Sequence, residues 1–163
     1  MSVSPKSITV SIATQQLWLR QGTTVLACYP VSTAQAGAGE QEGSGCTPRG
    51  RHQVVERYGE GMPIGTVFVA RQPTGEIHTT ALAAQYPERD WILTRILRLA
   101  GCEPGFNQGP GCDSYDRYIY IHGTPDTEPM GEPRSHGCVR MRNTDLVALF
   151  EQVPVGTVVE IFA

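Results

Sequence analysis

The sequence predicts a mainly β chain with two helices, and three observations indicate this fold class. The 163 residues include 18 glycines and 12 prolines, so many turns are expected. Several short segments alternate apolar and polar residues, as half-buried strands do. Two segments, at about 89–100 and about 144–152, repeat apolar residues at helical spacing. A chain of this length is expected to form a single domain over residues 1–163.

Three strands are predicted near the N-terminus. Residues 7–13 alternate apolar and hydroxyl side chains, residues 16–20 continue the alternation, and residues 23–32 follow a turn. We expect them to pair as a meander, with Cys28 buried in the third strand. Residues 34–45 contain four glycines among small residues and are predicted to be a loop.

A turn and a hairpin are predicted in the middle of the chain. The sequence Thr47-Pro48-Arg49-Gly50 is typical of a turn, and His52 is expected on the solvent side of the strand that follows. Residues 66–71 and 76–79 should form a hairpin that turns at Pro73-Thr74-Gly75.

The first helix is predicted between Arg89 and Ala100. Asp90 is a suitable N-cap residue, and the segment ends at Gly101, a residue that commonly follows a helix. Its three arginines, Arg89, Arg95 and Arg98, are expected to form a solvated side. A glycine-rich loop over residues 102–114 should follow it.

The second helix, at about 144–152, is predicted from apolar residues at positions i, i+3, i+4 and i+7, with Asn143 as its cap. Residues 154–156, Pro-Val-Gly, predict a turn, and residues 157–162 a last strand.

The chemistry is expected from residues 135–140, Ser-His-Gly-Cys-Val-Arg, and from the strand that ends at His122. In residues 118–122, Tyr-Ile-Tyr-Ile-His, the alternation places the two isoleucines in the core and Tyr120 and His122 on the opposite face. A cysteine near imidazoles can deprotonate, attack a carbonyl and hold the acyl group as a thioester. We therefore predict that Cys138 is a nucleophile.

Four neighbours of Cys138 have predicted roles. His122 and His136 are both candidates for the base that accepts the thiol proton, because a free thiol is mostly protonated at neutral pH. Gly123 and Gly137 lack a Cβ and can present backbone groups to a substrate. Backbone N–H groups around Gly137 and Cys138, assisted by His136, are expected to stabilise an oxyanion.

Two other interpretations of these residues stay open. Cys138 would be inert if it were simply buried beside a structural turn. A zinc ion could be bound by His122, His136 and Cys138, although the common paired spacings of zinc ligands are missing.

Composition excludes several classes of partner. The net charge is −3, with positive charges interspersed among negative ones, so neither nucleic acid nor a membrane surface is an expected partner. No motif calls for a cofactor or a metal. Five cysteines are an odd number without framework spacing; Cys102 and Cys112 could pair under oxidising conditions, but free thiols are expected.

The motif residues resemble those of the YkuD-type L,D-transpeptidase catalytic domain. The resemblance is strongest over residues 119–162 and is also present in the N-terminal third. It is carried by these segments: His122-Gly123-Thr124, Gly131, Ser135-His136-Gly137-Cys138-Val139-Arg140-Met141, Asp145, Leu17-Trp18-Leu19, Tyr29-Pro30-Val31-Ser32-Thr33 and Thr47-Pro48-Arg49-Gly50.

The resemblance implies a β-sandwich or barrel-like fold, in which the segment at about 89–100 and the loop after it, within residues 81–117, would be an insertion. It also implies that His122, rather than His136, is the base for Cys138, with the Gly123 carbonyl orienting the imidazole. The substrate implied is the tetrapeptide stem of peptidoglycan, cut between meso-diaminopimelate and D-Ala. Carbapenem-type inhibitors are expected to acylate Cys138.

Four residues are predicted to contact the substrate. Arg140 is the candidate for anchoring a carboxylate, because a guanidinium presents a planar fork to it. Its alternative role is that of a buried arginine that holds the loop through backbone carbonyls. Ser135, Tyr120 and Arg49 are the other predicted contacts.

The fate of the thioester depends on what attacks it. No signal peptide or membrane span is recognisable in residues 1–20. A cytoplasmic location is therefore expected, or a periplasmic one if a native leader was removed. In the cytoplasm, stem or muropeptide fragments would be hydrolysed by an L,D-carboxypeptidase during recycling. The alternatives are an L,D-transpeptidase that cross-links stems and a non-catalytic wall-binding module.

Overall fold

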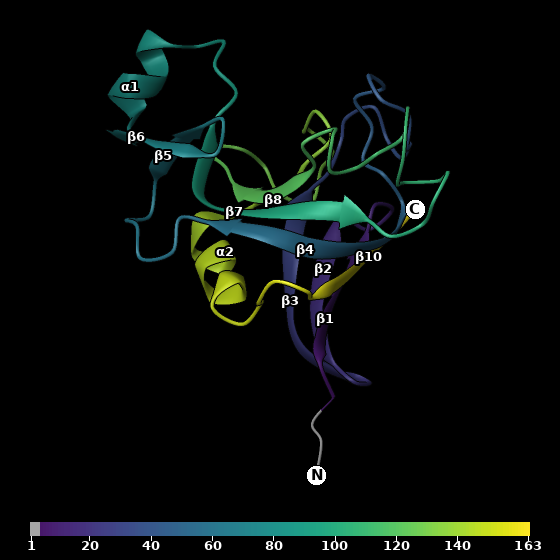
Figure 1. The fold of residues 1–163 in the computed structure, drawn as a ribbon. Helices are drawn as coiled ribbons and strands as arrows, with labels where there is room; N and C mark the ends of the chain where they lie inside the picture. Colours follow the sequence, from purple (N-terminus) through teal and green to yellow (C-terminus); the bar gives the residue numbers. More distant parts are fainter. Residues whose placement is uncertain (1–3) are drawn as a thin grey trace.

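The computed structural model describes residues 4–163, which form ten strands and two helices (Figure 1). All ten strands belong to one sheet, in the order β4-β10-β1-β2-β3-β9-β8-β7-β5-β6, and β4 also pairs with β7. This extra pairing closes the sheet into a barrel-like ring, from which the β5–β6 hairpin extends. The strands are β1 (Lys6–Ser11), β2 (Gln16–Gln21), β3 (Thr24–Ser32), β4 (Gly50–Tyr58), β5 (Thr66–Val69), β6 (Gln72–Ile77), β7 (Ile92–Gly101), β8 (Tyr120–Gly123), β9 (Val139–Met141) and β10 (Val158–Phe162).

The predicted mainly β class with two helices is confirmed, although only one of the helices was placed correctly. Helix α1 (Thr80–Gln85) lies beside β5 and β6 at one corner of the molecule, and α2 (Asn143–Phe150) packs beneath β7 (Figure 1). Neither helix in residues 4–163 has the length and apolarity needed to cross a membrane.

The main core fills the ring of strands. It joins residues from almost every strand of the ring to the buried face of α2, including Leu17, Leu97, Ile121 and Leu149. Ile119 and Ile121 belong to this core, as their alternation predicted. The following strand β9 pairs in parallel with β8, with His122 opposite Arg140. The core thus fixes the two strands that carry the predicted chemistry.

The N-terminal meander is confirmed, because β1, β2 and β3 pair in antiparallel order. The predicted last strand is also present as β10, which pairs in parallel with β1. The burial of Cys28 was wrong: the residue lies in β3 but its side chain is exposed.

The helix predicted at 89–100 was wrong, because this segment forms strand β7. The strand is flanked by β4, β5 and β8 and is buried on both faces. Its sequence is therefore a nearly continuous apolar run rather than an alternation. A bulge between Leu93 and Ile96, where Thr94 has φ of 77°, shifts the alternation so that it imitates helical spacing. Since β7 is the strand that β4 meets to close the ring, it is part of the core sheet rather than an insertion.

The side chains around this strand were misplaced for the same reason. Arg95 and Arg98 are buried rather than solvated; Arg95 donates to the carbonyls of Met62 and Thr94, and Arg98 pairs with Glu56. Asp90 caps no helix. It lies in the segment before β7.

The β5–β6 hairpin is confirmed, but its turn was misplaced. Val69 pairs with Gln72, so the turn consists of Ala70 and Arg71 instead of residues 73–75. Both turn residues have positive φ, 48° and 66°, a conformation for which glycine or asparagine is usual. The absence of those residues hid the turn from the sequence analysis.

Two polar residues are buried, one predicted on the solvent side of a strand and one predicted as a helix cap. His52 is fully buried in β4, where its ring lies 2.8 Å from the Ser114 hydroxyl and 3.0 Å from the Gly50 carbonyl, and burial lowers its pKa. Asn143 begins α2 but does not cap it, because the N-cap position belongs to Arg142. Its side chain instead bonds Thr94 and the Thr124 carbonyl, tying α2 to the bulge of β7.

Candidate active site

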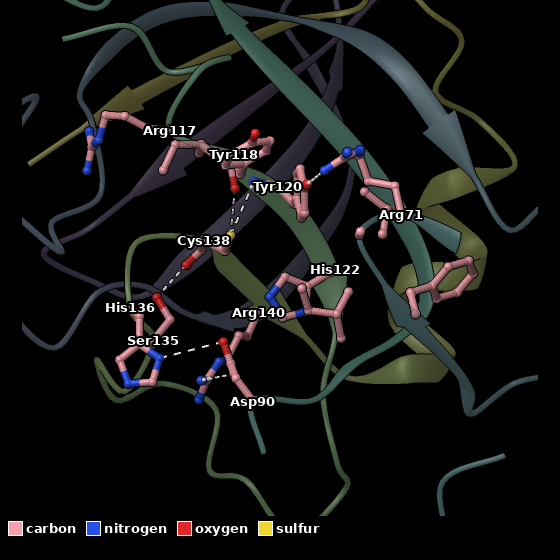
Figure 2. A pocket seen from close by; sticks show the side chains of 15 residues that line it. Arg71, Asp90, Arg117, Tyr118, Tyr120, His122, Ser135, His136, Cys138 and Arg140 are labelled. Carbon is pink, nitrogen blue, oxygen red and sulfur yellow. Dashed lines mark hydrogen bonds and ion pairs between the residues drawn. The ribbon is translucent and has the colours of Figure 1, made fainter. Parts of the chain in front are cut away.

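A cavity of about 270 Å³ lies against β8, β9 and the tip of the β5–β6 hairpin. It contains most of the residues singled out in the sequence: Tyr120, His122, Ser135, His136, Cys138 and Arg140 (Figure 2). Arg49 lies elsewhere. Its guanidinium pairs with Glu40 at 2.7 Å and does not line this cavity, so the structure does not support the predicted substrate contact.

His122 is buried at the inner side of the cavity, on β8. Its Nδ1 lies 2.6 Å from the Gly123 carbonyl, which fixes the ring and assigns the Nδ1 proton to that bond. Nε2 is then the nitrogen with a free lone pair. Gly123 must be glycine, because a Cβ there would collide with Asn143 Oδ1 and the Leu93 carbonyl. The backbone of Gly123 therefore positions the imidazole as predicted.

The Cys138 thiol is half-buried and is held by the backbone of the strand opposite. Its Sγ lies 3.3 Å from the Tyr118 carbonyl, to which the thiol donates, and accepts from the Tyr120 N–H at 3.3 Å (Figure 2). Within residues 4–163, no hydrogen bond joins Sγ to the imidazole of His122, although both side chains line the same cavity. In this state the thiol proton stays on Sγ and is donated to the Tyr118 carbonyl.

Electrostatics keep both groups neutral in this state. Burial raises the pKa of the Cys138 thiol to about 11, and the Tyr120 N–H and the guanidiniums of Arg140 and Arg117 only partly offset this effect. Burial lowers the pKa of His122, against the opposing effect of its bond to Gly123. A neutral thiol thus faces a neutral imidazole, so deprotonation must accompany attack on a substrate.

The loop before Cys138 is closed by short local bonds. The Ser135 hydroxyl donates to the Cys138 carbonyl at 2.5 Å and accepts from the Gly137 N–H at 3.2 Å. Gly137 has φ of 135°, which favours glycine. Ser135 therefore shapes the loop that carries the thiol. The Gly137 N–H, which was predicted to stabilise an oxyanion, already donates to the Ser135 hydroxyl.

Thr47 was missed as a residue of the site. Its buried hydroxyl donates to the Gly137 carbonyl at 2.8 Å and accepts from the Ala34 N–H at 2.9 Å. This side chain adds to the backbone bonds of Thr33 and Gln35 with Ser135, which also join the loop after β3 to the Cys138 loop. The sequence contained Thr47 in a turn motif, but nothing in the pattern indicated a partner ninety residues away.

Asp90 was also missed, because it was assigned to a helix. One carboxylate oxygen lies 3.1 Å from Nη2 of Arg140, and the other lies 3.6 Å from Nδ1 of His136 (Figure 2). The Arg140 side chain is nine-tenths buried and its Nε has no partner, whereas the His136 side chain is 74% exposed. His136 therefore lies at the mouth of the cavity.

Two arginines complete the cavity wall, and neither was singled out in the sequence. Arg71, at the hairpin tip, donates to the Tyr120 hydroxyl at 3.0 Å. Arg117 donates to the carbonyls of Cys46 and Gly39, at 2.6 and 3.3 Å. Three guanidinium groups, including that of Arg140, thus line a cavity with one carboxylate.

The zinc alternative finds no support in the geometry. Within residues 4–163, no three His, Cys, Asp or Glu side chains are grouped so that they could hold a metal ion. All five cysteines are free thiols, including Cys102 and Cys112.

Fold and cavity together define a class of protein: a closed β fold that presents a cysteine opposite a buried, backbone-oriented histidine. The chain matches the L,D-transpeptidase catalytic domain family, YkuD, over residues 5–161. It therefore belongs to the YkuD family of L,D-transpeptidase catalytic domains.

Curated relatives carry the same family name. The chain is 32% identical over 159 residues to the probable L,D-transpeptidase ErfK/SrfK of Salmonella typhimurium, which covers 96% of this chain and 44% of the relative. It is 54% identical over 44 residues to the probable L,D-transpeptidase YbiS of Escherichia coli, covering 27% of this chain and 14% of the relative. The chain thus spans less than half the length of these relatives.

Solved structures share the fold. L,D-transpeptidase 3 from Mycobacterium tuberculosis, in complex with a faropenem-derived adduct, superposes with a TM-score of 0.60 at 14% identity, covering 97% of this chain and 60% of that one. An L,D-transpeptidase from Mycobacterium smegmatis gives a TM-score of 0.57 at 15% identity, covering 98% and 59%. The predicted barrel-like fold is confirmed.

Proposed function

We propose that this chain is a cysteine acyltransferase that cleaves the bond between meso-diaminopimelate and D-Ala in peptidoglycan stem tetrapeptides. The observation that supports this most directly is the placement of Cys138 and His122 in one cavity, with Nδ1 of His122 bonded to Gly123 so that Nε2 is left as the base. The names of the curated relatives support the reaction class.

The proposed first half-reaction forms a thioester. When the substrate enters, rotation of the Cys138 side chain exchanges the Tyr118 carbonyl for His122 as proton acceptor. Sγ attacks the carbonyl carbon at the L-centre of meso-diaminopimelate, and the thiol proton passes to Nε2 of His122. The C–N bond then breaks, and the same proton moves to the departing amine of the D-residue. The Gly123 carbonyl holds Nδ1–H throughout and stabilises the transient imidazolium.

The second half-reaction releases the acyl group. An attacking water or amine gives a proton to His122, the thioester bond breaks, and the proton returns to sulfur. Water would make the chain an L,D-carboxypeptidase, and a neighbouring stem amine would make it an L,D-transpeptidase. The expected preference for hydrolysis stays a prediction, because the cavity favours neither acceptor. The expected cytoplasmic location also stays a prediction.

Product analysis tests the proposal. Purified protein is incubated with disaccharide-tetrapeptide, alone and with a second stem, and the products are weighed by mass spectrometry. Tripeptide indicates hydrolysis, and a cross-linked dimer indicates transfer. Cleavage should disappear in Cys138→Ala, whereas Cys28→Ala, which removes an exposed thiol on β3, serves as the control.

A carbapenem separates the enzyme from a non-catalytic wall-binding module. Ring opening by Sγ should add the mass of the intact inhibitor at Cys138. That a solved neighbour from M. tuberculosis is in complex with a faropenem-derived adduct supports this choice of probe. A chain that binds stems but forms neither the adduct nor any product would be a binding module, and the proposal would be wrong.

A further inference from the structure

The three guanidinium groups of the cavity differ in the protein groups to which their N–H groups are already bonded. Arg140 is paired with the Asp90 carboxylate at 3.1 Å. Arg117 is tied to the protein itself, because it donates to the carbonyls of Cys46 and Gly39 and to the Ser44 hydroxyl. Both groups are therefore committed before any substrate arrives.

Arg71 has no such commitment. Its one hydrogen bond goes to the hydroxyl of Tyr120, and its guanidinium lies over the ring of Tyr118 at 5.2 Å from the centroid (Figure 2). Within residues 4–163, no carboxylate lies within ion-pair distance of it. A cation faces the cavity without a counter-charge, and a bound anion would supply one.

The backbone at Arg71 gives a second, independent indication. Ala70 and Arg71 form a two-residue turn with φ of 48° and 66°, where glycine or asparagine would relieve the strain. Strained residues that persist in a fold concentrate at ligand-binding sites. This turn directs Arg71 over the cavity instead of into solvent.

The position of Arg71 relative to the thiol suggests which anion it binds. Tyr120 links the two: its hydroxyl accepts from Arg71, and its N–H donates to Sγ of Cys138. In the leaving D-residue, the terminal carboxylate lies only a few bonds from the carbonyl that Sγ attacks. Arg71 and Cys138 line the same cavity, so a substrate whose carbonyl meets Sγ brings its nearby terminal carboxylate into the cavity that Arg71 faces.

We propose that Arg71 is a specificity-determining residue that binds the terminal carboxylate of the D-residue leaving the substrate. This inference rests on the proposed function. It assigns to the hairpin tip the recognition of a free C-terminus, so that stems ending in a carboxylate are preferred over stems whose terminus is blocked.

The test compares two tetrapeptide donors that differ only in a terminal carboxylate or carboxamide. Their dissociation constants are measured by calorimetry in the Cys138→Ala chain, which cannot turn them over, and KM and kcat are measured in the active chain. Arg71→Gln should weaken binding of the carboxylate donor by about 10- to 100-fold and leave the carboxamide donor unchanged. Arg71→Lys should recover part of the loss, because it keeps the charge but not the fork.

Arg51→Gln is the matched control, since it removes an exposed arginine of β4 that does not line the cavity. Equal losses on both donors in Arg71→Gln would mean that Arg71 only holds the hairpin to Tyr120, and the inference would be wrong. It would also be wrong if the preference for carboxylate survived in Arg71→Gln and vanished in Arg140→Gln. Binding of neither donor, together with no carbapenem adduct at Cys138, would overturn the proposed function as well.

Discussion

The two sides of the cavity are built differently. The inner wall, formed by β8, β9 and Cys138, is fixed by backbone pairing to the core, and its His122 is buried. The outer wall, formed by Ala70, Arg71 and Asp90, consists of exposed or half-exposed residues, and Arg71 and Asp90 are held there by side-chain contacts rather than by backbone pairing to the core. This difference matches the two proposals, which assign bond making to the side fixed by backbone pairing and substrate selection to the side held by side-chain contacts.

The largest effect is expected from the inner wall. Cys138→Ala removes the nucleophile, so no acyl-enzyme can form, and intact-mass measurement after carbapenem treatment should show no adduct. Cys28→Ala should react as the unaltered chain does. An adduct of full yield in Cys138→Ala would place the nucleophile elsewhere.

The two histidines provide the next contrast. His122→Ala should slow acylation by about 10²- to 10⁴-fold, the usual contribution of a general base. His136→Ala should slow it by less than about tenfold, because that ring lies exposed at the mouth of the cavity and contacts Asp90 rather than the thiol. Stopped-flow acylation rates measure both, and the reverse order would assign the base to His136.

The pH dependence follows from the burial of His122. Only the neutral imidazole can accept the thiol proton, and burial lowers the pKa of His122 below its ordinary value of 6.5. The acylation rate should therefore stay level as pH falls from 7 through 6.5 and decline only at lower pH. An acidic limb centred at 6.5 or above would contradict the assignment of the base to the buried His122.

Thr47→Val tests how the thiol loop is held to the inner wall. The change leaves the buried Gly137 carbonyl and Ala34 N–H without their partner, at a cost of about 2 kcal/mol in the free energy of unfolding. Urea denaturation measures this loss. Thr24→Val, at an exposed position of β3, should change stability by less than about 0.5 kcal/mol.

The smallest effect is expected at the outer wall. Ala70→Gly removes strain of about 1 kcal/mol from a residue with positive φ, but it also raises the entropy of the unfolded chain by nearly as much. The net change should be a stabilisation of at most about 0.5 kcal/mol by thermal unfolding. Ala84→Gly, in α1, should instead destabilise the chain by about 1 kcal/mol.

The success of the sequence analysis follows the same division. The meander and α2 were predicted because each has a clear period and a buried face. The strand that carries His122 was predicted from its alternation of residue types, although all four residues of β8 are buried. Strand β7 was missed because it is buried on both faces and bulged at Thr94, which replaces the period of two by an apparent helical one. Because the segment was assigned to a helix, Arg95 and Arg98 were wrongly predicted to be solvated, whereas both are buried.

The inner wall of the site was read from local sequence, whereas its supports were not. The motifs around His122 and Cys138 are contiguous, and the resemblance they carry proved to be membership of the family. Thr47, Arg71 and Asp90 come from distant segments, and Arg117, which directly precedes Tyr118, has its partners in a distant segment. The roles of all four depend on tertiary contacts that no local period records. Arg71 was hidden further by a turn without glycine.

The hydrogen bond from the Cys138 thiol to the Tyr118 carbonyl has a practical consequence for labelling experiments. General alkylating reagents such as iodoacetamide consume thiolates, and a sulfur kept protonated at neutral pH reacts with them slowly. The open surface of β3 offers Cys28 to the same reagents without hindrance. A bulk assay of thiol consumption would then report mainly on Cys28. Labelling of Cys138 therefore has to be measured on the separate peptides.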